Sequence, residues 1–302
     1  MSPGAPGPDR LQPALPSPLQ PVDDARFTRH GVQLLLKRDD LIHPDLPGNK
    51  WRKLAPNLAA AAAGRTVLTF GGAYSNHLRA TAAAGRLLGF PTIGVVRGDE
   101  LAGRPLNPSL ARCAADGMRL YFVDRRAYRA KTIPAGLTGD GLVDDETCVI
   151  PEGGSNTAAV HGCAALGREL HGLADTIGVA VGTGGTLAGL AAGLAPGQRV
   201  IGFPVVRGGF LGDDVLALQQ ATFGSRAGDW RLDDRFHCGG YARVSPALES
   251  FAADFEDQHG LPVERLYVAK MLFGLTTLAT EGRFPPGTRV AAVVTGQPVS
   301  SR

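Results

Sequence analysis

Two lysines lie one helical turn apart in the segment Gly48-Asn49-Lys50-Trp51-Arg52-Lys53. The chain uses lysine sparingly, with five lysines among 31 basic residues, so arginine supplies most of its positive charge. A lysine amine can form a Schiff base, which arginine cannot, and a second cation or partial burial makes that amine lose its proton more readily. The pair therefore predicts a nucleophilic amine at the start of a helix.

A glycine-rich loop, Gly182-Thr183-Gly184-Gly185-Thr186, lies between an apolar run and a small-residue helical pattern. Glycines let backbone N–H groups approach phosphate oxygens, threonine hydroxyls add donors, and a helix N-terminus carries partial positive charge. A dinucleotide fingerprint would require glycine where the chain has Leu187, and the loop lacks the Gly-Lys-Ser/Thr of a Walker A motif. The loop predicts an anion site, with a tight turn that binds no ligand as the alternative.

A second polar loop, Gly71-Gly72-Ala73-Tyr74-Ser75-Asn76-His77, also follows a strand-like run and enters a helix. Ser75 and Asn76 suit a helix N-cap, and a single histidine such as His77 is more often structural than catalytic. Polar groups at the carboxyl end of a strand in an open α/β sheet nevertheless lie where ligands bind. Taken together, these residues predict a ligand-facing loop.

Alternating strand and helix patterns must position these loops, and this alternation is typical of parallel sheets covered on both faces. We expect strands at residues 32–37, 66–70, 92–96, 119–123, 147–150, 176–182, 199–204 and 289–295, and helices at 51–63, 75–88, 107–116, 157–171, 187–194, 214–221, 245–258 and 270–281. The predicted fold class is α/β. A small inserted α/β domain, 50–150, separates the two parts of a large domain, 23–49 and 151–302.

Composition narrows the class of protein. The net charge of +3 and the lack of a basic run argue against nucleic-acid binding, and four cysteines without metal spacing predict reduced thiols in a reducing compartment. The first 22 residues hold seven prolines and no apolar core segment, which predicts an extended arm rather than a signal peptide. No apolar stretch reaches the length of a membrane span, so we expect a cytoplasmic protein.

Several motifs in order carry a family resemblance. Besides the lysine pair and the two loops, the chain contains Pro151-Glu152-Gly153-Gly154-Ser155-Asn156 and Gly-x-Phe-Pro-x-Gly at 282–287. Over residues 18–297 the sequence resembles the pyridoxal-phosphate enzymes of the tryptophan-synthase-β fold type that include 1-aminocyclopropane-1-carboxylate deaminase and D-cysteine desulfhydrase. The resemblance implies two open, twisted, mostly parallel sheets covered by helices, with a pyridoxal 5'-phosphate cleft between the lobes, and it favours a homodimer.

The resemblance also implies roles for particular residues. Lys50 would form a Schiff base with the cofactor aldehyde, and Lys53 would hold the phosphate together with Gly182, Thr183, Gly184, Gly185 and Thr186. The remaining site residues would be Asn76 at the ring hydroxyl, Ser75 at the substrate carboxylate or in proton transfer, His77 and Tyr267 near the substrate, and Thr295 facing the pyridine nitrogen. A neutral hydroxyl there would not fix a protonated ring, which limits the charge that the cofactor absorbs.

One departure from the family bears on the substrate. Deaminases that open the cyclopropane ring carry a second tyrosine on the final strand, where this chain has Ala292. Elimination from a β-carbon needs only the lysine and an electron sink, so we expect α,β-elimination from D-cysteine or a related β-substituted alanine, giving keto acid and ammonia. Ring opening of 1-aminocyclopropane-1-carboxylate through Tyr267 alone is the alternative, and a non-catalytic protein that binds the cofactor or an amino acid is a second alternative.

Overall fold

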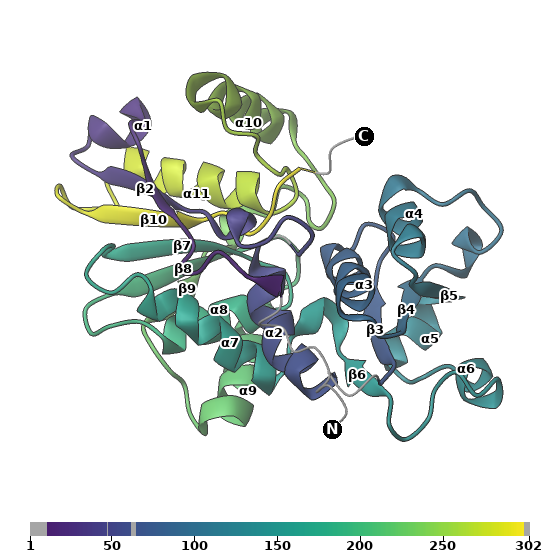
Figure 1. Ribbon diagram of the computed structural model, residues 1–302. Coiled ribbons are helices and arrows are strands. Elements are labelled where there is room, and N and C mark those ends of the chain that lie inside the picture. Colours follow the sequence, from purple (N-terminus) through teal and green to yellow (C-terminus); the bar gives the residue numbers. More distant parts are fainter. Residues whose placement is uncertain (1–10, 47, 62–64, 299–302) are drawn as a thin grey trace.

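Ten strands form two separate sheets in the computed structural model, which describes residues 11–46, 48–61 and 65–298 (Figure 1). The six-stranded sheet has the order β1-β2-β10-β7-β8-β9, and the four-stranded sheet has the order β5-β4-β3-β6. Apart from β1, which runs antiparallel to β2, every pairing is parallel. The predicted α/β class with two mostly parallel sheets is confirmed.

Helices cover both faces of the six-stranded sheet. Its strands are β1 (Leu19–Val22), β2 (Gln33–Lys37), β7 (Thr176–Val181), β8 (Arg199–Pro204), β9 (Trp230–Leu232) and β10 (Arg289–Val293). One apolar cluster joins this sheet to α1 (Ala25–Thr28), α10 (Pro246–His259) and α11 (Val268–Thr280), and a second joins it to α7 (Thr157–Arg168), α8 (Gly185–Ala192) and α9 (Leu211–Phe223) (Figure 1). Burial on both faces explains why these strands are continuous apolar runs.

The four-stranded sheet is built from β3 (Val67–Gly71), β4 (Thr92–Arg97), β5 (Arg119–Val123) and β6 (Cys148–Ile150). Apolar side chains join it to α3 (Asn76–Leu88) and α4 (Pro108–Ala115) in one cluster, and to α5 (Arg125–Ala130) and α6 (Ala135–Gly139) in another. This sheet and its helices lie beside the larger sheet in Figure 1. Its strands and helices come from one continuous stretch of the chain, 67–150.

Helix α2 (Asn49–Ala61) bridges the two sheets. Leu54 and Leu58 belong to an apolar cluster with Val67 of β3. On the other side α2 packs closely against α7, because Gly162 lacks the Cβ that would lie 2.1 Å from the Arg52 carbonyl oxygen. The predicted domain boundary at residue 50 therefore falls inside a helix that packs on the four-stranded sheet on one side and on α7 on the other.

Some short elements escaped the sequence patterns, namely β1, β9, α1, α5 and α6. Each has six residues or fewer, too few to display a clear periodicity. Residues 19–22 of the predicted Pro-rich arm form the edge strand β1, so this part of the arm lies on the body. The predicted end of α2 at 62–64 lies outside the described residues. None of the helices in the described part of the chain is long and apolar enough to cross a membrane.

Candidate active site

A cavity of about 440 Å³ lies between the two sheets, at the N-terminus of α2 and the carboxyl ends of β3, β7 and β10. Parallel strands bring the loops that follow them to the same edge of a sheet, which explains why the loops after β7 and β10 meet. The loop after β3 belongs to the other sheet and lines the cavity from that side. Eleven of the twelve site residues expected from the sequence line it: Lys50, Lys53, Ser75, Asn76, His77, Gly182, Thr183, Gly184, Thr186, Tyr267 and Thr295. The twelfth, Gly185, is the buried first residue of α8.

Lys50 lies in the first turn of α2 with its amine in the cavity. Burial, and secondarily the charge of Lys53, lowers the pKa of Lys50 to about 7. The turn is held against the end of β10, because the Asn49 N–H donates to the Thr295 carbonyl at 3.3 Å. Gly48 has a φ of +68°, and a Cβ there would lie 1.7 Å from the same carbonyl oxygen, so only glycine fits. At neutral pH this amine is therefore about half unprotonated.

Lys53 is directed at a different set of partners. Its Nζ donates to the Gly153 carbonyl at 3.0 Å and to the Ser155 Oγ at 2.9 Å, and Ser155 Oγ lies 2.6 Å from Thr183 Oγ1. Burial lowers the pKa of Lys53 to about 8. The two lysines are thus one turn apart in sequence, but only Lys53 is tied to the glycine-rich loop.

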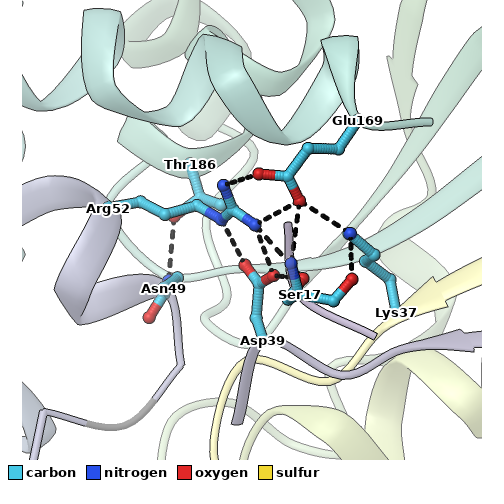
Figure 2. Close-up of polar contacts among 7 residues, drawn as sticks. All are labelled: Ser17, Lys37, Asp39, Asn49, Arg52, Glu169 and Thr186. Carbon is cyan, nitrogen blue, oxygen red and sulfur yellow. Dashed lines mark hydrogen bonds and ion pairs between the residues drawn. The ribbon is translucent and has the colours of Figure 1, made fainter. Parts of the chain in front are cut away.

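The glycine-rich loop connects β7 to α8 and forms an open cradle. Gly184 has a φ of +78° and caps α8 without a side chain. A Cβ on Gly185 would lie 2.6 Å from Ser155 Oγ and 3.3 Å from Lys53 Nζ. Since side chains there would fill the space beside an ammonium group and a helix N-terminus, the cradle suits a phosphate-sized anion. Figure 2 shows that Asn49 ties α2 to α8 through Thr186, with Nδ2 to Oγ1 at 2.8 Å.

Ser75 and Asn76 begin α3 on the opposite sheet. Ser75 Oγ caps α3 by accepting from the Leu78 N–H at 3.3 Å, which leaves the hydroxyl proton available to another partner. Asn76 Oδ1 accepts from Arg79, and within the described residues its amide nitrogen makes no hydrogen bond. The N-cap role and a ligand role are therefore compatible.

His77 is buried, and its hydrogen bonds fix its tautomer. The Thr69 hydroxyl donates its one proton to the Ile150 carbonyl at 2.7 Å, so it can only accept from His77 Nε2, which lies at 2.8 Å. Burial, with the charges of Lys50 and Lys53, holds the pKa of His77 well below its usual range. His77 is thus neutral with a proton on Nε2, and Nδ1 has no partner within the described residues.

Tyr267 and Thr295 complete the cavity on the side of the large sheet. Burial raises the pKa of Tyr267 well above its usual range, so its hydroxyl stays protonated. Glu264 accepts from the backbone N–H groups of Leu266 and Tyr267, both at 2.7 Å, and so fixes the start of α11. The phenol is therefore a rigidly placed hydrogen-bond donor.

An ion cluster around Arg52 fixes α2 to neighbouring segments (Figure 2). Arg52 donates to Asp39 Oδ2 and to Glu169 Oε1, each at 2.8 Å. Glu169 Oε2 also lies 2.7 Å from Lys37 Nζ, and Ser17 Oγ donates to Asp39 at 2.6 Å. Segments far apart in the sequence thus hold the helix that carries Lys50.

Several residues in or beside the cavity were not predicted as site residues. Ser155 contacts Lys53 beside the cavity, and its motif was recognised in the sequence although no role was given to it. Asn49, Glu264, Arg97 and Tyr241 line the cavity itself. Arg97, at the end of β4, and Tyr241, in a loop, gave no sequence signal, because neither is part of a motif that predicts a site.

Ala292 does not line the cavity. It is buried in β10 between Leu36 of β2 and Gly178 of β7, and it packs in the apolar cluster against α11. No side chain from this position reaches the site.

Comparisons with known proteins show which family the chain is similar to. A family model described as "Pyridoxal-phosphate dependent enzyme" matches residues 11–296. The chain is 30% identical to D-cysteine desulfhydrase from Klebsiella pneumoniae, covering 93% of this chain and 91% of the relative. It is 28% identical to a putative 1-aminocyclopropane-1-carboxylate deaminase from Pyrococcus furiosus, covering 88% and 85%.

Solved structures give the same fold. A crystal structure of an ACC deaminase homologue is 26% identical, with a TM-score of 0.77 over 93% of this chain and 89% of that one. A hydrogen sulfide-producing enzyme from Fusobacterium nucleatum is 13% identical, with a TM-score of 0.68 over 93% and 95%, and shows the fold alone.

Proposed function

The chain belongs to the family of pyridoxal-phosphate-dependent enzymes, and on this premise we propose that it catalyses α,β-elimination from a small β-substituted amino acid, with D-cysteine as the first candidate. The products would be a keto acid, ammonia and the leaving group, here sulfide. The observation that carries the proposal is the amine of Lys50, with a pKa of about 7, in the same cavity as an anion cradle.

The donor groups of the cavity fit the cofactor. The cradle of Gly182 to Thr186 with Lys53 would hold the phosphate, the amide nitrogen of Asn76 would donate to the ring hydroxyl, and Thr295 would face the ring nitrogen. When bound, pyridoxal phosphate supplies an aldehyde that condenses with amines and a ring that withdraws electrons from the substrate Cα.

Three side chains would act on the substrate. Lys50 Nζ would take the Cα proton, since an amine with a pKa of about 7 is about half neutral at pH 7. Ser75 Oγ, free to donate, would hold the substrate carboxylate or pass a proton. Tyr267 would donate its hydroxyl proton to the departing group. His77 would line the substrate site as an uncharged side chain, because its Nε2 proton is donated to Thr69.

Position 292 favours elimination over ring opening. Opening a cyclopropane ring requires added acid or nucleophile chemistry, and Ala292 brings no functional group to the site from β10. A relative with 30% identity is named D-cysteine desulfhydrase. Both observations support a β-substituted alanine as substrate.

Ring opening of 1-aminocyclopropane-1-carboxylate is the second candidate function. The Pyrococcus furiosus relative carries the name of that deaminase, and Tyr267 lines the cavity. The two functions are separated by one assay of purified enzyme, in which pyruvate and sulfide from D-cysteine are measured beside 2-oxobutyrate from the cyclopropane acid. We expect product from D-cysteine; product from the cyclopropane acid alone would reverse the order.

A cofactor-binding protein without turnover would show the Schiff-base absorbance, about 410 to 430 nm, but release no keto acid from any small D- or L-amino acid. We further propose that the protein is a cytoplasmic homodimer. All four cysteines are free thiols, as a reducing compartment favours. Light scattering should give twice the mass of the chain, and a monomer would contradict the dimer.

A further inference from the structure

Tyr241 lies in the active-site cavity beside Tyr267, although the two residues come from different elements. Their ring centroids are 6.2 Å apart with an interplanar angle of 69°, an edge-to-face contact. Burial raises the pKa of Tyr267, and the nearby Tyr241 raises it further. Tyr241 also lines a second, outer cavity of about 810 Å³, so this residue borders both cavities.

The loop that carries Tyr241 is held in an unusual conformation. Cys238 and Ala242 have φ angles of +52° and +57°, and Gly239 and Gly240 have +92° and +114°. A left-handed conformation costs a non-glycine residue of order 1 kcal/mol or more, and persists only where the surroundings impose it. The strain is therefore concentrated on the residues that flank Tyr241.

Lys270 supplies the restraint. It is fully buried on α11, three residues after Tyr267, and its Nζ donates to the Gly240 carbonyl at 2.9 Å and approaches the Val205 carbonyl at 3.5 Å. No carboxylate within the described part of the chain forms an ion pair with it. Burying a lysine without a carboxylate partner costs free energy, and the short hydrogen bond of this lysine goes to Gly240, the residue before Tyr241. The N-terminus of α11 thus carries both Tyr267, its N-cap residue, and Lys270, which holds the loop of Tyr241 beside Tyr267.

We propose that Tyr241 is the relay residue that returns a proton to Tyr267 during elimination, and that Lys270 positions Tyr241 for this role. The proposal rests on the elimination reaction proposed above. The Tyr267 hydroxyl proton passes to the leaving group as its bond to the substrate β-carbon breaks. The resulting Tyr267 oxyanion takes the proton of Tyr241, and Tyr241 takes one from water at the outer cavity. The net change is one proton from water, with no oxidant or reductant.

Tyr241 comes from the segment before α10 and not from the final strand, so it does not stand at the strand position where ring-opening deaminases carry their second tyrosine.

The first experiment compares leaving groups in the holoenzyme. Tyr241→Phe keeps the ring and removes the hydroxyl, so kcat should fall about 10-fold or more with D-cysteine, whose thiolate takes a proton. It should change less than about 2-fold with β-chloroalanine, since chloride leaves without one. Tyr121→Phe, on β5 outside the cavity, is the matched control and should change neither rate. Equal losses with both substrates, or no loss, would overturn the relay.

Lys270→Met replaces the ammonium group by an uncharged side chain of similar length. It should reproduce the substrate-dependent loss of Tyr241→Phe, and the double variant should lose no more than either single variant, because both changes remove one relay. Additive losses would show that Lys270 acts independently and would overturn its positioning role.

A crystal structure of the holoenzyme tests the proposal without turnover. The Tyr241 and Tyr267 hydroxyls should lie within hydrogen-bond distance, directly or through one water, with Lys270 on the Gly240 carbonyl. A Tyr241 side chain turned into solvent would overturn the proposal. If wild-type enzyme yields keto acid from neither substrate, the proposed function fails. The crystal structure of the holoenzyme then decides by itself whether the Tyr241 and Tyr267 hydroxyls are hydrogen-bonded.

Discussion

Lys50 and Lys53 show how surroundings divide the work of two chemically identical residues. Lys53 has fixed partners at the cradle, Gly153 and Ser155, whereas Lys50 has its amine in the cavity. Burial lowers the pKa of both, and the nearby charge of Lys53 lowers that of Lys50 further. We therefore propose the covalent role for Lys50, the lysine that loses its proton first.

The pH dependence of cofactor capture tests this assignment. Only a neutral amine attacks an aldehyde, so the rate at which apoprotein takes up pyridoxal phosphate should rise with pH with a midpoint at about 7. A solvent-exposed lysine would give a midpoint near the ordinary 10.5. The growth of absorbance at about 410 to 430 nm follows the reaction, and it should be lost in Lys50→Ala. Retention of the band in that variant would assign the Schiff base to another lysine.

The glycine-rich cradle allows a second residue-scale prediction. Gly184→Asp introduces a side chain and a negative charge at a φ of +78°, where a Cβ would lie 2.9 Å from Val215 Cγ2, and it should abolish cofactor retention in equilibrium dialysis. Gly197→Asp is the matched control, because its φ is +85° and its Cβ would meet nothing within 4 Å. The control should bear similar backbone strain yet keep the cofactor. Normal retention by Gly184→Asp would place the phosphate elsewhere.

At the scale of elements, the position of α2 depends on charged groups and not only on apolar packing. Arg52 links the helix to Asp39, which follows β2, and to Glu169, which follows α7. Because these groups are largely buried, the loss of one partner leaves a charge without compensation. The cluster therefore fixes the axial position of the helix whose first turn carries Lys50.

Arg52→Met should lower the free energy of unfolding by about 3–5 kcal/mol, measured by urea denaturation. Arg65→Met is the control, since the exposed Arg65 lies 4.0 Å from Glu146 and its loss should cost less than about 1 kcal/mol. Burial alone would raise the pKa of Glu169, but Arg52 and Lys37 lower it overall. This carboxylate stabilises the fold at neutral pH, and that stability is lost as the pH falls through its lowered pKa. Equal effects of the two variants would contradict the role of the cluster.

At the scale of the whole molecule, the site belongs to neither sheet alone. Ser75 and Asn76 come from the four-stranded sheet, the glycine-rich loop and Thr295 from the six-stranded sheet, and Lys50 from the helix between them. A ligand in this cavity contacts both sheets and opposes their separation.

Cofactor binding should therefore stabilise the molecule as one unit. A ligand at 100 times its Kd adds about 2.7 kcal/mol to the free energy of unfolding. Calorimetry should show a single transition at higher temperature for holoenzyme than for apoprotein. Pyridoxal without its phosphate, the control ligand, should give a smaller shift. Two transitions, only one of which moves, would show that the cofactor is held by one sheet.

Much of the fold could be predicted because its signals are local. Fully buried strands such as β7 and β8 appear as apolar runs, and α3 begins at the cap residue Ser75 that its sequence predicts. Helical periodicity places Lys53 one turn after Lys50. The loops at 71–77 and 182–186 each follow the carboxyl end of a parallel strand, as their sequences predict, but the two strands belong to different sheets, and only the tertiary structure brings these loops together. Short elements such as β9 and α6 could not be predicted, because they have too few residues to show a period.

The sequence by itself determined which groups are available: a lysine pair, a glycine cradle, and capped polar loops on alternating strands and helices. Only the tertiary structure decided which of them meet. It brought Ser155 to Lys53, Tyr241 to Tyr267, and the buried amine of Lys270 to the Gly240 carbonyl. The physical reason is that periodicity and capping act over a few neighbouring residues, whereas these contacts depend on how two sheets and their helices pack across long separations in the chain.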